Sequence, residues 1–170
     1  MGVHLIVDGY NLSRSGKVAL DGDPLSDAGR KELCTLLGGF AAAKGFRLTV
    51  VFDGRGSGRP ERGRTAFKGG TALYSCATES ADDVIRDISR NAPAGTIVVT
   101  SDRGLAGTLP SRSVAVVPCD DFADRLFSFQ LGTVKGADDE EPHARRAGKK
   151  GEGHRLNKKD RKREARLRRL

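Results

Sequence analysis

The chain has 170 residues, which suits one domain of ordinary size with an extension and excludes two full domains. Hydrophobic residues make up 37% of the sequence, enough to form a buried core. The net charge of +8 is uneven, because residues 1–134 carry 16 Lys and Arg against 15 Asp and Glu, whereas residues 135–170 carry 14 against 7. We therefore expect a near-neutral folded domain over residues 1–134 and a basic, largely disordered or helical tail over residues 135–170.

The first half of the chain predicts two buried strands joined by an amphipathic helix. An apolar run predicts a strand over residues 3–8, and a polar, glycine-containing stretch follows it to Pro24. Ser26 can cap a helix that ends at Lys44-Gly45. Four apolar residues of this helix fall on one face: Leu33, Leu36, Leu37 and Phe40. A second strand covers residues 47–52. Four glycines and four arginines in residues 54–64 then predict a mobile basic loop without regular structure.

The second half continues the alternation of strands and helices. Strands are predicted over residues 72–75, 96–100 and 114–117. One helix begins after Ser80, and a last core helix begins at Asp120 or Asp121. The expected core side chains of the last helix are Phe122, Leu126, Phe127 and Phe129. Strands that alternate with helices predict an α/β fold with a parallel sheet, right-handed crossovers and helices on both faces.

Three of the apolar runs end on an aspartate, namely Asp8, Asp53 and Asp102. The carboxyl ends of parallel strands meet at one edge of a sheet, where ligands of open α/β sheets bind. Converging carboxylates repel one another unless protons or a cation compensate their charge. Mg²⁺ or Mn²⁺ is the simplest compensation, so metal-assisted phosphodiester chemistry is the first hypothesis.

Further polar residues lie close to these strand ends. The amide of Asn11 can hold a water, a metal-bound ligand or a phosphate oxygen, and the hydroxyls of Thr100 and Ser101 can orient the carboxylates or bind a phosphate oxygen. Asp83 can complete a capping box with Ser80. Asp82 then points about 100° around the helix and can face the crevice. For Asp53 and Glu79 the sequence allows both a supporting role in the site and a purely structural one.

Other classes of site find no support in the sequence. The chain has no Gly-x-Gly-x-x-Gly after its first strand, no Gly-Lys-Ser/Thr phosphate loop and no Gly-x-Ser-x-Gly elbow, so we expect no small-molecule cofactor. Three widely spaced cysteines without Cys-x-x-Cys spacing predict reduced thiols and argue against zinc. His4 is expected to pack within its strand. Neither a signal peptide nor a membrane span is recognisable, so we expect a cytoplasmic protein without membrane contact.

At the acidic positions the sequence resembles the NYN family of PIN-like ribonucleases, specifically its YacP-like branch. The matching segments lie in order across about residues 3–130: Val7-Asp8-Gly9-Tyr10-Asn11, Val51-Phe52-Asp53-Gly54, Glu79-Ser80-Ala81-Asp82-Asp83 and Thr100-Ser101-Asp102. The resemblance implies a three-layer α/β/α PIN-like fold with a central, mainly parallel sheet. It also implies an acidic site that binds Mg²⁺ or Mn²⁺ and cleaves RNA internally, with mRNA at the ribosome as the associated substrate.

By this resemblance Asp8, Asp82 and Asp102 map onto the metal site, with Asn11 beside it. We expect a metal-dependent endoribonuclease that acts on single-stranded RNA or mRNA, with RNA and the ribosome as its partners. A metal-activated water would attack the scissile phosphate in line, and Asp83 completes the set of catalytic candidates. The expected RNA contacts are basic side chains of the loop and the tail: Arg55, Arg59, Arg62, Arg64, Lys68, Lys158, Lys159, Arg161, Lys162 and Arg163.

Two other functions are compatible with the same sequence. One is an RNA- or ribosome-binding module whose acidic site is inactive and needs no metal. The other is an aspartate-dependent phosphatase with Asp8 as the nucleophile. Such a phosphatase requires a second acid two residues later as proton donor, and Tyr10 occupies that position.

Deleting residues 149–170 is predicted to weaken binding to RNA or the ribosome. The deletion removes 11 Lys and Arg against 3 Asp and Glu. Each phosphate contact that is lost should reduce the slope of log affinity against log salt by about 0.7 for single-stranded RNA. Affinity measured over a salt series tests this, and an unchanged slope would contradict it.

Overall fold

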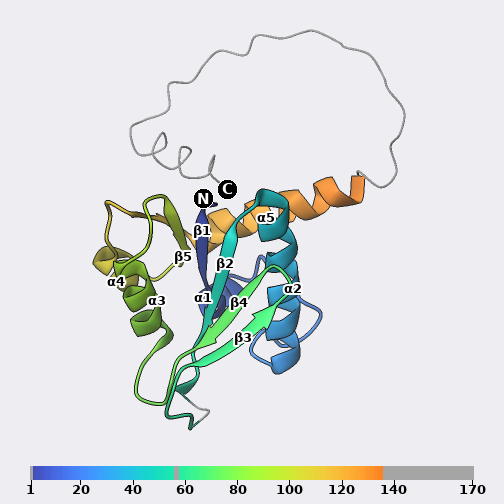
Figure 1. The fold of residues 1–170 in the computed structure, drawn as a ribbon. Helices are drawn as coiled ribbons and strands as arrows, with labels where there is room; N and C mark the ends of the chain where they lie inside the picture. Colours follow the sequence, from blue (N-terminus) through green and yellow to red (C-terminus); the bar gives the residue numbers. More distant parts are fainter. Residues whose placement is uncertain (1, 56–57, 136–170) are drawn as a thin grey trace.

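The computed structural model describes residues 2–55 and 58–135 (Figure 1). The expected RNA contacts of the tail, from Lys158 to Arg163, therefore lie outside the described residues and stay predictions. The described residues form a six-stranded sheet in the order β3-β4-β2-β1-β5-β6. The strands are β1 (His4–Asp8), β2 (Arg47–Phe52), β3 (Gly63–Phe67), β4 (Gly70–Tyr74), β5 (Thr96–Val99) and β6 (Val114–Val117).

The sheet is mainly parallel, as the sequence predicts. Every neighbouring pair of strands is parallel except β3 and β4, which form an antiparallel hairpin. β1 lies between β2 and β5 near the centre of the sheet. Asp8 ends β1, and the chain reaches Asp102 shortly after β5, so the two residues follow neighbouring strands as expected.

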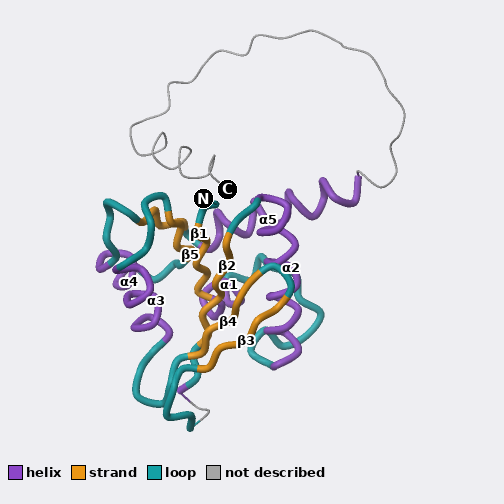
Figure 2. Tube along the Cα trace, in the orientation of Figure 1, coloured by secondary structure: helices purple, strands orange, loops and turns teal. Residues whose placement is uncertain are grey.

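Helices cover both faces of the sheet and complete three layers (Figures 1 and 2). They are α1 (Gly9–Arg14), α2 (Asp27–Lys44), α3 (Ala81–Arg90), α4 (Arg103–Thr108) and α5 (Cys119–Lys135). One apolar cluster joins α1, α2 and α5 to side chains such as Leu5 and Val50. The other joins α3 and α4 to Ile6 and Val51 on the opposite face. Side chains of consecutive strand residues point to opposite faces, so each buried strand contributes to both clusters.

The helices α2 and α3 begin at the residues that their capping side chains predict. Ser26 accepts a hydrogen bond from the Gly29 N–H at 3.0 Å and caps α2, and Gly45 ends this helix with a left-handed φ of 66°. Ser80 caps α3 and forms the predicted capping box with Asp83. These boundaries depend on contacts within a few residues, which explains why the sequence alone determines them.

Two short helices were not predicted. α1 and α4 each have six residues and begin directly after Asp8 and Asp102, whose side chains cap them. The stretch from Asp8 to Pro24, expected to be irregular, therefore begins with a turn and a half of helix. Six residues are too few to show an apolar helical period, so these helices depend on the strands that place their first residues.

The basic loop predicted over residues 54–64 was too long. Its last residues, Gly63 and Arg64, belong to β3, which pairs with β4 through the register Gly63 to Tyr74 and Phe67 to Gly70. β3 is an edge strand with three exposed residues in its middle, so it lacks the apolar alternation that identifies a strand in a sequence.

The last helix begins at Cys119, one residue before the predicted start, and one of its expected core residues is misplaced. Phe122 is buried and meets Phe40 edge to face, with ring centroids 5.5 Å apart. Phe127 is 56% exposed, because it points away from the face of α5 that carries Phe122 and Leu126. The prediction of Phe127 as a core residue was wrong.

Other sequence expectations agree with the structure. Cys34, Cys76 and Cys119 are free thiols and buried. His4 is buried in β1, and its Nε2 lies 2.9 Å from the Thr49 hydroxyl. Among the described helices, none combines the length and the apolar character required to cross a bilayer.

Two adjacent glycines of α2 test the packing of this helix on the β3–β4 hairpin. A Cβ at Gly38 would overlap the carbonyl oxygen of Lys68, whereas a Cβ at Gly39 would meet nothing within 4 Å. Gly38→Ala should lower the free energy of unfolding by about 1–3 kcal/mol. Gly39→Ala should raise it by up to about 1 kcal/mol, because alanine favours the helix. Urea denaturation of both variants measures the difference, and equal effects would contradict this packing.

Candidate active site

Asp8 is the most buried carboxylate of the site, at 1% exposure. Its Oδ1 accepts a hydrogen bond from the Asn11 N–H at 3.1 Å, and its Oδ2 accepts one from Asn11 Nδ2 at 2.6 Å. The Thr100 hydroxyl donates to the same Oδ2 at 3.2 Å. Burial raises the pKa of Asp8, hydrogen bonds from Asn11 and Thr100 oppose this shift, and the charge of Asp102 adds to it. The side chain is therefore fixed in position but short of positive charge.

Asp102 is joined to Asp8 through Thr100. The Thr100 hydroxyl donates to Asp8 and accepts the Asp102 N–H at 3.2 Å. Oδ1 of Asp102 accepts the Leu105 N–H at 2.8 Å and so begins α4. The prediction that the Thr100 hydroxyl orients a carboxylate is confirmed for Asp8, whereas its contact with Asp102 is to the backbone N–H. Ser101 instead accepts the Cys119 N–H at 3.0 Å, at the start of α5.

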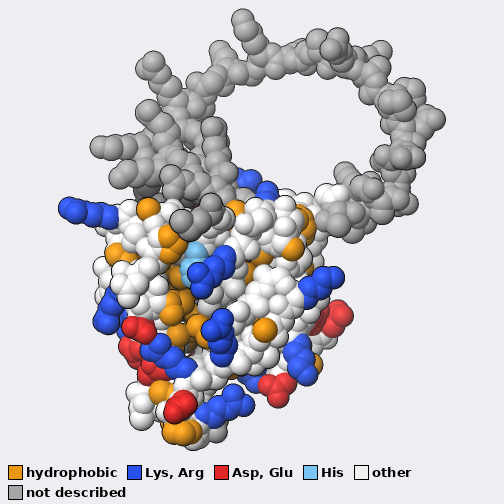
Figure 3. Space-filling view, viewed as in Figure 1, with side chains coloured by type: hydrophobic (Ala, Val, Ile, Leu, Met, Phe, Trp, Pro, Cys, Tyr) orange, Lys and Arg blue, Asp and Glu red, His pale blue; other side chains and the backbone are white. Residues whose placement is uncertain are grey.

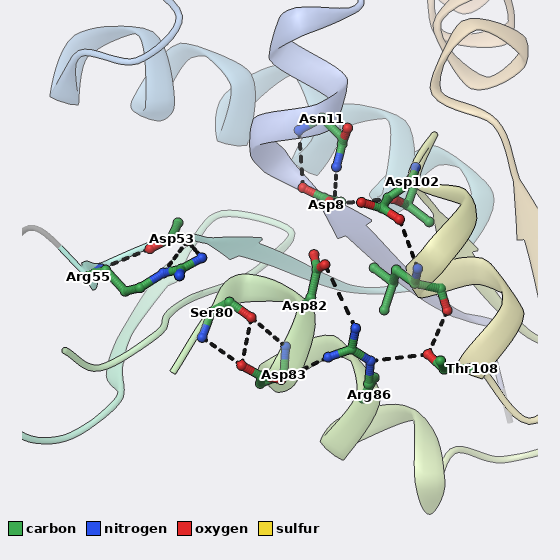
Figure 4. Close-up of polar contacts among 12 residues, drawn as sticks. Asp8, Asn11, Asp53, Arg55, Ser80, Asp82, Asp83, Arg86, Asp102 and Thr108 are labelled. Atoms are coloured by element: carbon green, nitrogen blue, oxygen red, sulfur yellow. Dashed lines mark hydrogen bonds and ion pairs between the residues drawn. The ribbon is translucent and has the colours of Figure 1, made fainter. Parts of the chain in front are cut away.

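Asp82 reaches the same place from the opposite side. It lies in the first turn of α3, and its carboxylate points toward Asp8 and Asp102 (Figure 4). Burial raises the pKa of Asp82, and the charges of Asp8 and Asp102 raise it further. Arg86 partly offsets this effect from 3.9 Å. The structure thus brings together the three aspartates proposed as metal ligands, with Asn11 beside them.

Asp83 has a different environment from its neighbour. Its Oδ2 accepts the Ser80 N–H at 2.9 Å, and its Oδ1 accepts from Arg86 at 2.8 Å. Hydrogen bonds from Ser80 and the charge of Arg86 lower the pKa of Asp83. Its carboxylate therefore caps α3 and does not join the three converging aspartates (Figure 4).

Asp53 and Glu79 are neutralised by arginines. Asp53 pairs with Arg55 at 3.1 Å, and Glu79 pairs with Arg62 at 2.8 Å. Arg62 also pairs with Asp87 at 2.7 Å and so ties the segment before β3 to α3. Hydrogen bonding to Arg62 lowers the pKa of Glu79 to about 2. These contacts favour the structural interpretation that the sequence left open for both acids.

Arg86 is a residue of this region that the sequence interpretation missed. Its guanidinium donates to Asp83 Oδ1 and to the Thr108 hydroxyl, 3.1 Å away, and it lies beside Asp82 (Figure 4). The spacing of three and four residues from Asp83 and Asp82 on a helix was the available signal. Arg86 links α3 to α4 and so holds two elements of the site together.

One of the three aspartates, Asp102, lines a cavity. A cavity of about 620 Å³ is lined by Thr100, Ser101, Asp102 and Arg103, with further residues of α4 and β6. This space is large enough to admit a phosphodiester and its flanking sugars next to Asp102.

A comparison with known protein families shows the family to which the chain belongs. The model of the YacP-like NYN domain matches residues 5–169. The chain belongs to this family. NYN domains are nuclease-like, which supports a ribonuclease type of reaction.

Solved structures show the same fold. The chain is similar to a crystal structure of Rae1 (YacP) from Bacillus subtilis, with 19% identity, a TM-score of 0.61 and coverage of 81% of this chain and 80% of that one. A point mutant of the same protein gives 20% identity, a TM-score of 0.57 and coverage of 83% and 86%. A search of curated proteins finds no match.

NYN nuclease domains generally depend on divalent metals, and the three aspartates of this site offer carboxylate oxygens as ligands for such an ion. Among the described residues no three His, Cys, Asp or Glu side chains form a closed metal-binding group. Three carboxylates that face one another across a gap nevertheless suit Mg²⁺ or Mn²⁺, because these ions prefer oxygen ligands and Mg²⁺ retains several waters. Burial is the main cause of the raised pKa values of Asp8 and Asp82, and the charges of neighbouring aspartates add to both shifts.

Thermal stability distinguishes the environment of Asp82 from that of Asp83. Without metal at about pH 7, Asp82→Asn should unfold at the same or a higher temperature than the wild type, because it removes a carboxylate whose ionisation is opposed. Asp83→Asn should unfold at a lower temperature, because ionised Asp83 stabilises the cap.

The pH dependence of the two effects has opposite signs. The cost of Asp82 grows as the pH rises through its raised pKa, whereas the stabilisation from Asp83 is lost as the pH falls through its lowered pKa. Thermal unfolding between about pH 3 and pH 7 measures both. A large loss of stability in Asp82→Asn would instead show that Asp82 is structural.

Proposed function

We propose that this protein is an Mg²⁺- or Mn²⁺-dependent endoribonuclease that cleaves single-stranded RNA. One observation carries the proposal. Asp8, Asp82 and Asp102 come from three separate parts of the chain and point toward one another, although burial and the neighbouring carboxylates raise the pKa values of Asp8 and Asp82 (Figure 4). Such an arrangement is costly for a structural site and useful for one that binds a cation.

Asp8, Asp82 and Asp102 would hold the ion, directly or through its waters. When bound, the ion supplies an activated water and neutralises charge that develops on the phosphate. Asn11 and Thr100 keep both oxygens of Asp8 in place, and the start of α4 fixes one oxygen of Asp102. These hydrogen bonds hold Asp8 and one oxygen of Asp102 in place before any ion binds, which would preorganise this part of the site.

The candidate RNA contacts differ in whether an ion pair with an acid of the chain is observed for them. Arg55 and Arg62 already pair with acids of the chain, so they would need to exchange partners to bind phosphate. Arg64 and Lys68 are exposed on the β3–β4 hairpin. Arg59 is exposed just before the hairpin and also interacts with other residues of the chain. We include the basic tail as a further RNA contact, and mRNA at the ribosome as the substrate context that the family resemblance suggests.

Loss of metal or of one ligand should abolish cleavage. Chelation by EDTA should stop cutting of labelled RNA, and added Mg²⁺ or Mn²⁺ should restore it. Asp82→Asn should reduce the rate at least about 100-fold, since metal catalysis contributes several kcal/mol and each 1.36 kcal/mol is a factor of ten. Asp124→Asn removes the same charge from an exposed position on α5 and should cleave like the wild type.

The assay should include Mg²⁺, Mn²⁺ and ribosomes in separate reactions. If the wild-type protein cuts RNA in none of them, the nuclease proposal fails and an inactive RNA- or ribosome-binding module takes its place. Hydrolysis of small phosphate esters would favour the phosphatase instead.

A further inference from the structure

A groove lined by both polar and apolar residues lies on the face of the sheet that carries α3. It encloses about 520 Å³. The strands contribute Arg47, Thr49, Arg64 and Leu73 to its walls, and α3 with the turn that follows contributes Ile88 and Asn91. We call it the Arg47–Arg64 groove. Figure 3 shows this side of the molecule, where apolar side chains form a furrow bordered by Lys and Arg side chains.

The pairing of the strands relates this groove to the acidic site. Asp8 pairs with Val51, Val51 pairs with Leu73, and Leu73 pairs with Arg64, so the four residues form one row across the sheet. Residues in such a row share a face, because side chains alternate along each strand. Arg64 thus lies three strand spacings from Asp8, or about 14 Å.

Arg47 occupies the same face nearer the other end of the strands. It pairs with His4, two side-chain rows before Asp8 on β1. α3 covers the part of this face near β1 and β2, where Ile6 and Val51 pack against it. The groove therefore follows the flank of α3 toward Arg47, on the same side of the sheet as the acidic site.

The charge of the groove is positive and uncompensated. Neither Arg47 nor Arg64 forms an ion pair with a carboxylate of the described residues, in contrast to Arg55, Arg62 and Arg86. No Asp or Glu is among the described residues that line the groove. Burial and the charge of Arg47 lower the pKa of His4, so at neutral pH the two arginines alone supply the charge.

We propose that the Arg47–Arg64 groove binds the phosphodiester backbone of RNA that flanks the cleavage position. This proposal rests on the function proposed above and adds a contact surface outside the acidic site. Two unpaired guanidinium groups suit phosphate oxygens, and the exposed parts of Leu73 and Ile88 can contact sugars or bases. An extended strand that leaves the acidic site on the α3 side would reach both arginines along the groove.

RNA and small anions such as inorganic phosphate both offer phosphate oxygens. A small anion is therefore the alternative ligand of this groove. A phosphate or mononucleotide would need only one arginine and its neighbours. An RNA strand would engage both arginines together, and its affinity would depend on length. Binding measurements with RNA of different length therefore distinguish the two.

The test compares the double variant Arg47→Gln/Arg64→Gln with Arg125→Gln. Arg125 is exposed on α5, on the other face of the sheet, so its variant controls for loss of positive charge. Binding of fluorescent single-stranded RNA of about 4 and about 16 nucleotides is measured by anisotropy over a salt series. EDTA is present throughout, so that no RNA is cut. Thermal unfolding checks that each variant is folded.

We expect the double variant to bind the longer RNA about tenfold more weakly than the wild type, equivalent to ~1.4 kcal/mol. The slope of log affinity against log salt should fall by about 1.4, since two phosphate contacts are lost. Binding of the shorter RNA should change much less. Arg125→Gln should match the wild type to within about twofold.

Two results would overturn the proposal. One is a double variant that binds the longer RNA like Arg125→Gln at every salt concentration. The other is competition by inorganic phosphate or a mononucleotide as effective as that by unlabelled RNA, which would identify a small-anion site. Because binding is measured without metal, it does not depend on catalysis. A wild-type protein that binds through the groove but never cleaves RNA would refute the proposed nuclease function alone.

Discussion

The buried carboxylate of Asp8 is the constraint around which the carboxyl end of the central strands is organised. It stands at the end of the central strand, where little water reaches it, and its pKa is raised by burial. Asn11 and Thr100 supply neutral hydrogen-bond donors and no positive charge. This combination fixes the position of the carboxylate without neutralising it. The same hydrogen bonds start α1 and join β1 to the segment after β5, so the local fold and the electrostatics of the site depend on one side chain.

Arginine partners divide the acidic residues of this region into two groups. Asp53, Glu79, Asp83 and Asp87 each contact an arginine directly, and the pKa values of the first three are lowered. Asp8 and Asp82 have raised pKa values and face Asp102. The first group stabilises loops and helix ends, as exposed ion pairs and caps commonly do. The second group is held in a repulsive arrangement, and a divalent cation would relieve this repulsion.

The arginines, like the acidic residues, fall into two groups. Arg55, Arg62 and Arg86 pair with acids of the chain, whereas Arg47 and Arg64 border a groove without acidic lining. Most of the net charge lies in residues 135–170, so residues 1–134 are nearly neutral and the proposed RNA binding by this part of the chain would depend on individually placed side chains. The proposed metal site and the proposed RNA-binding groove would then occupy different places in the same domain.

The sequence by itself determined the buried strands, the capped helices α2 and α3, the mainly parallel sheet and the convergence of Asp8, Asp82 and Asp102 at one end of that sheet. These features depend on apolar runs, on caps a few residues long, and on motifs that resemble a known family. The short helices α1 and α4, the edge strand β3 and the exposure of Phe127 were decided only by the tertiary structure, because each depends on a neighbour distant in the sequence. The same reason applies to Arg47 and Arg64. They are 17 residues apart, and only the pairing of β2, β4 and β3 brings them to one groove.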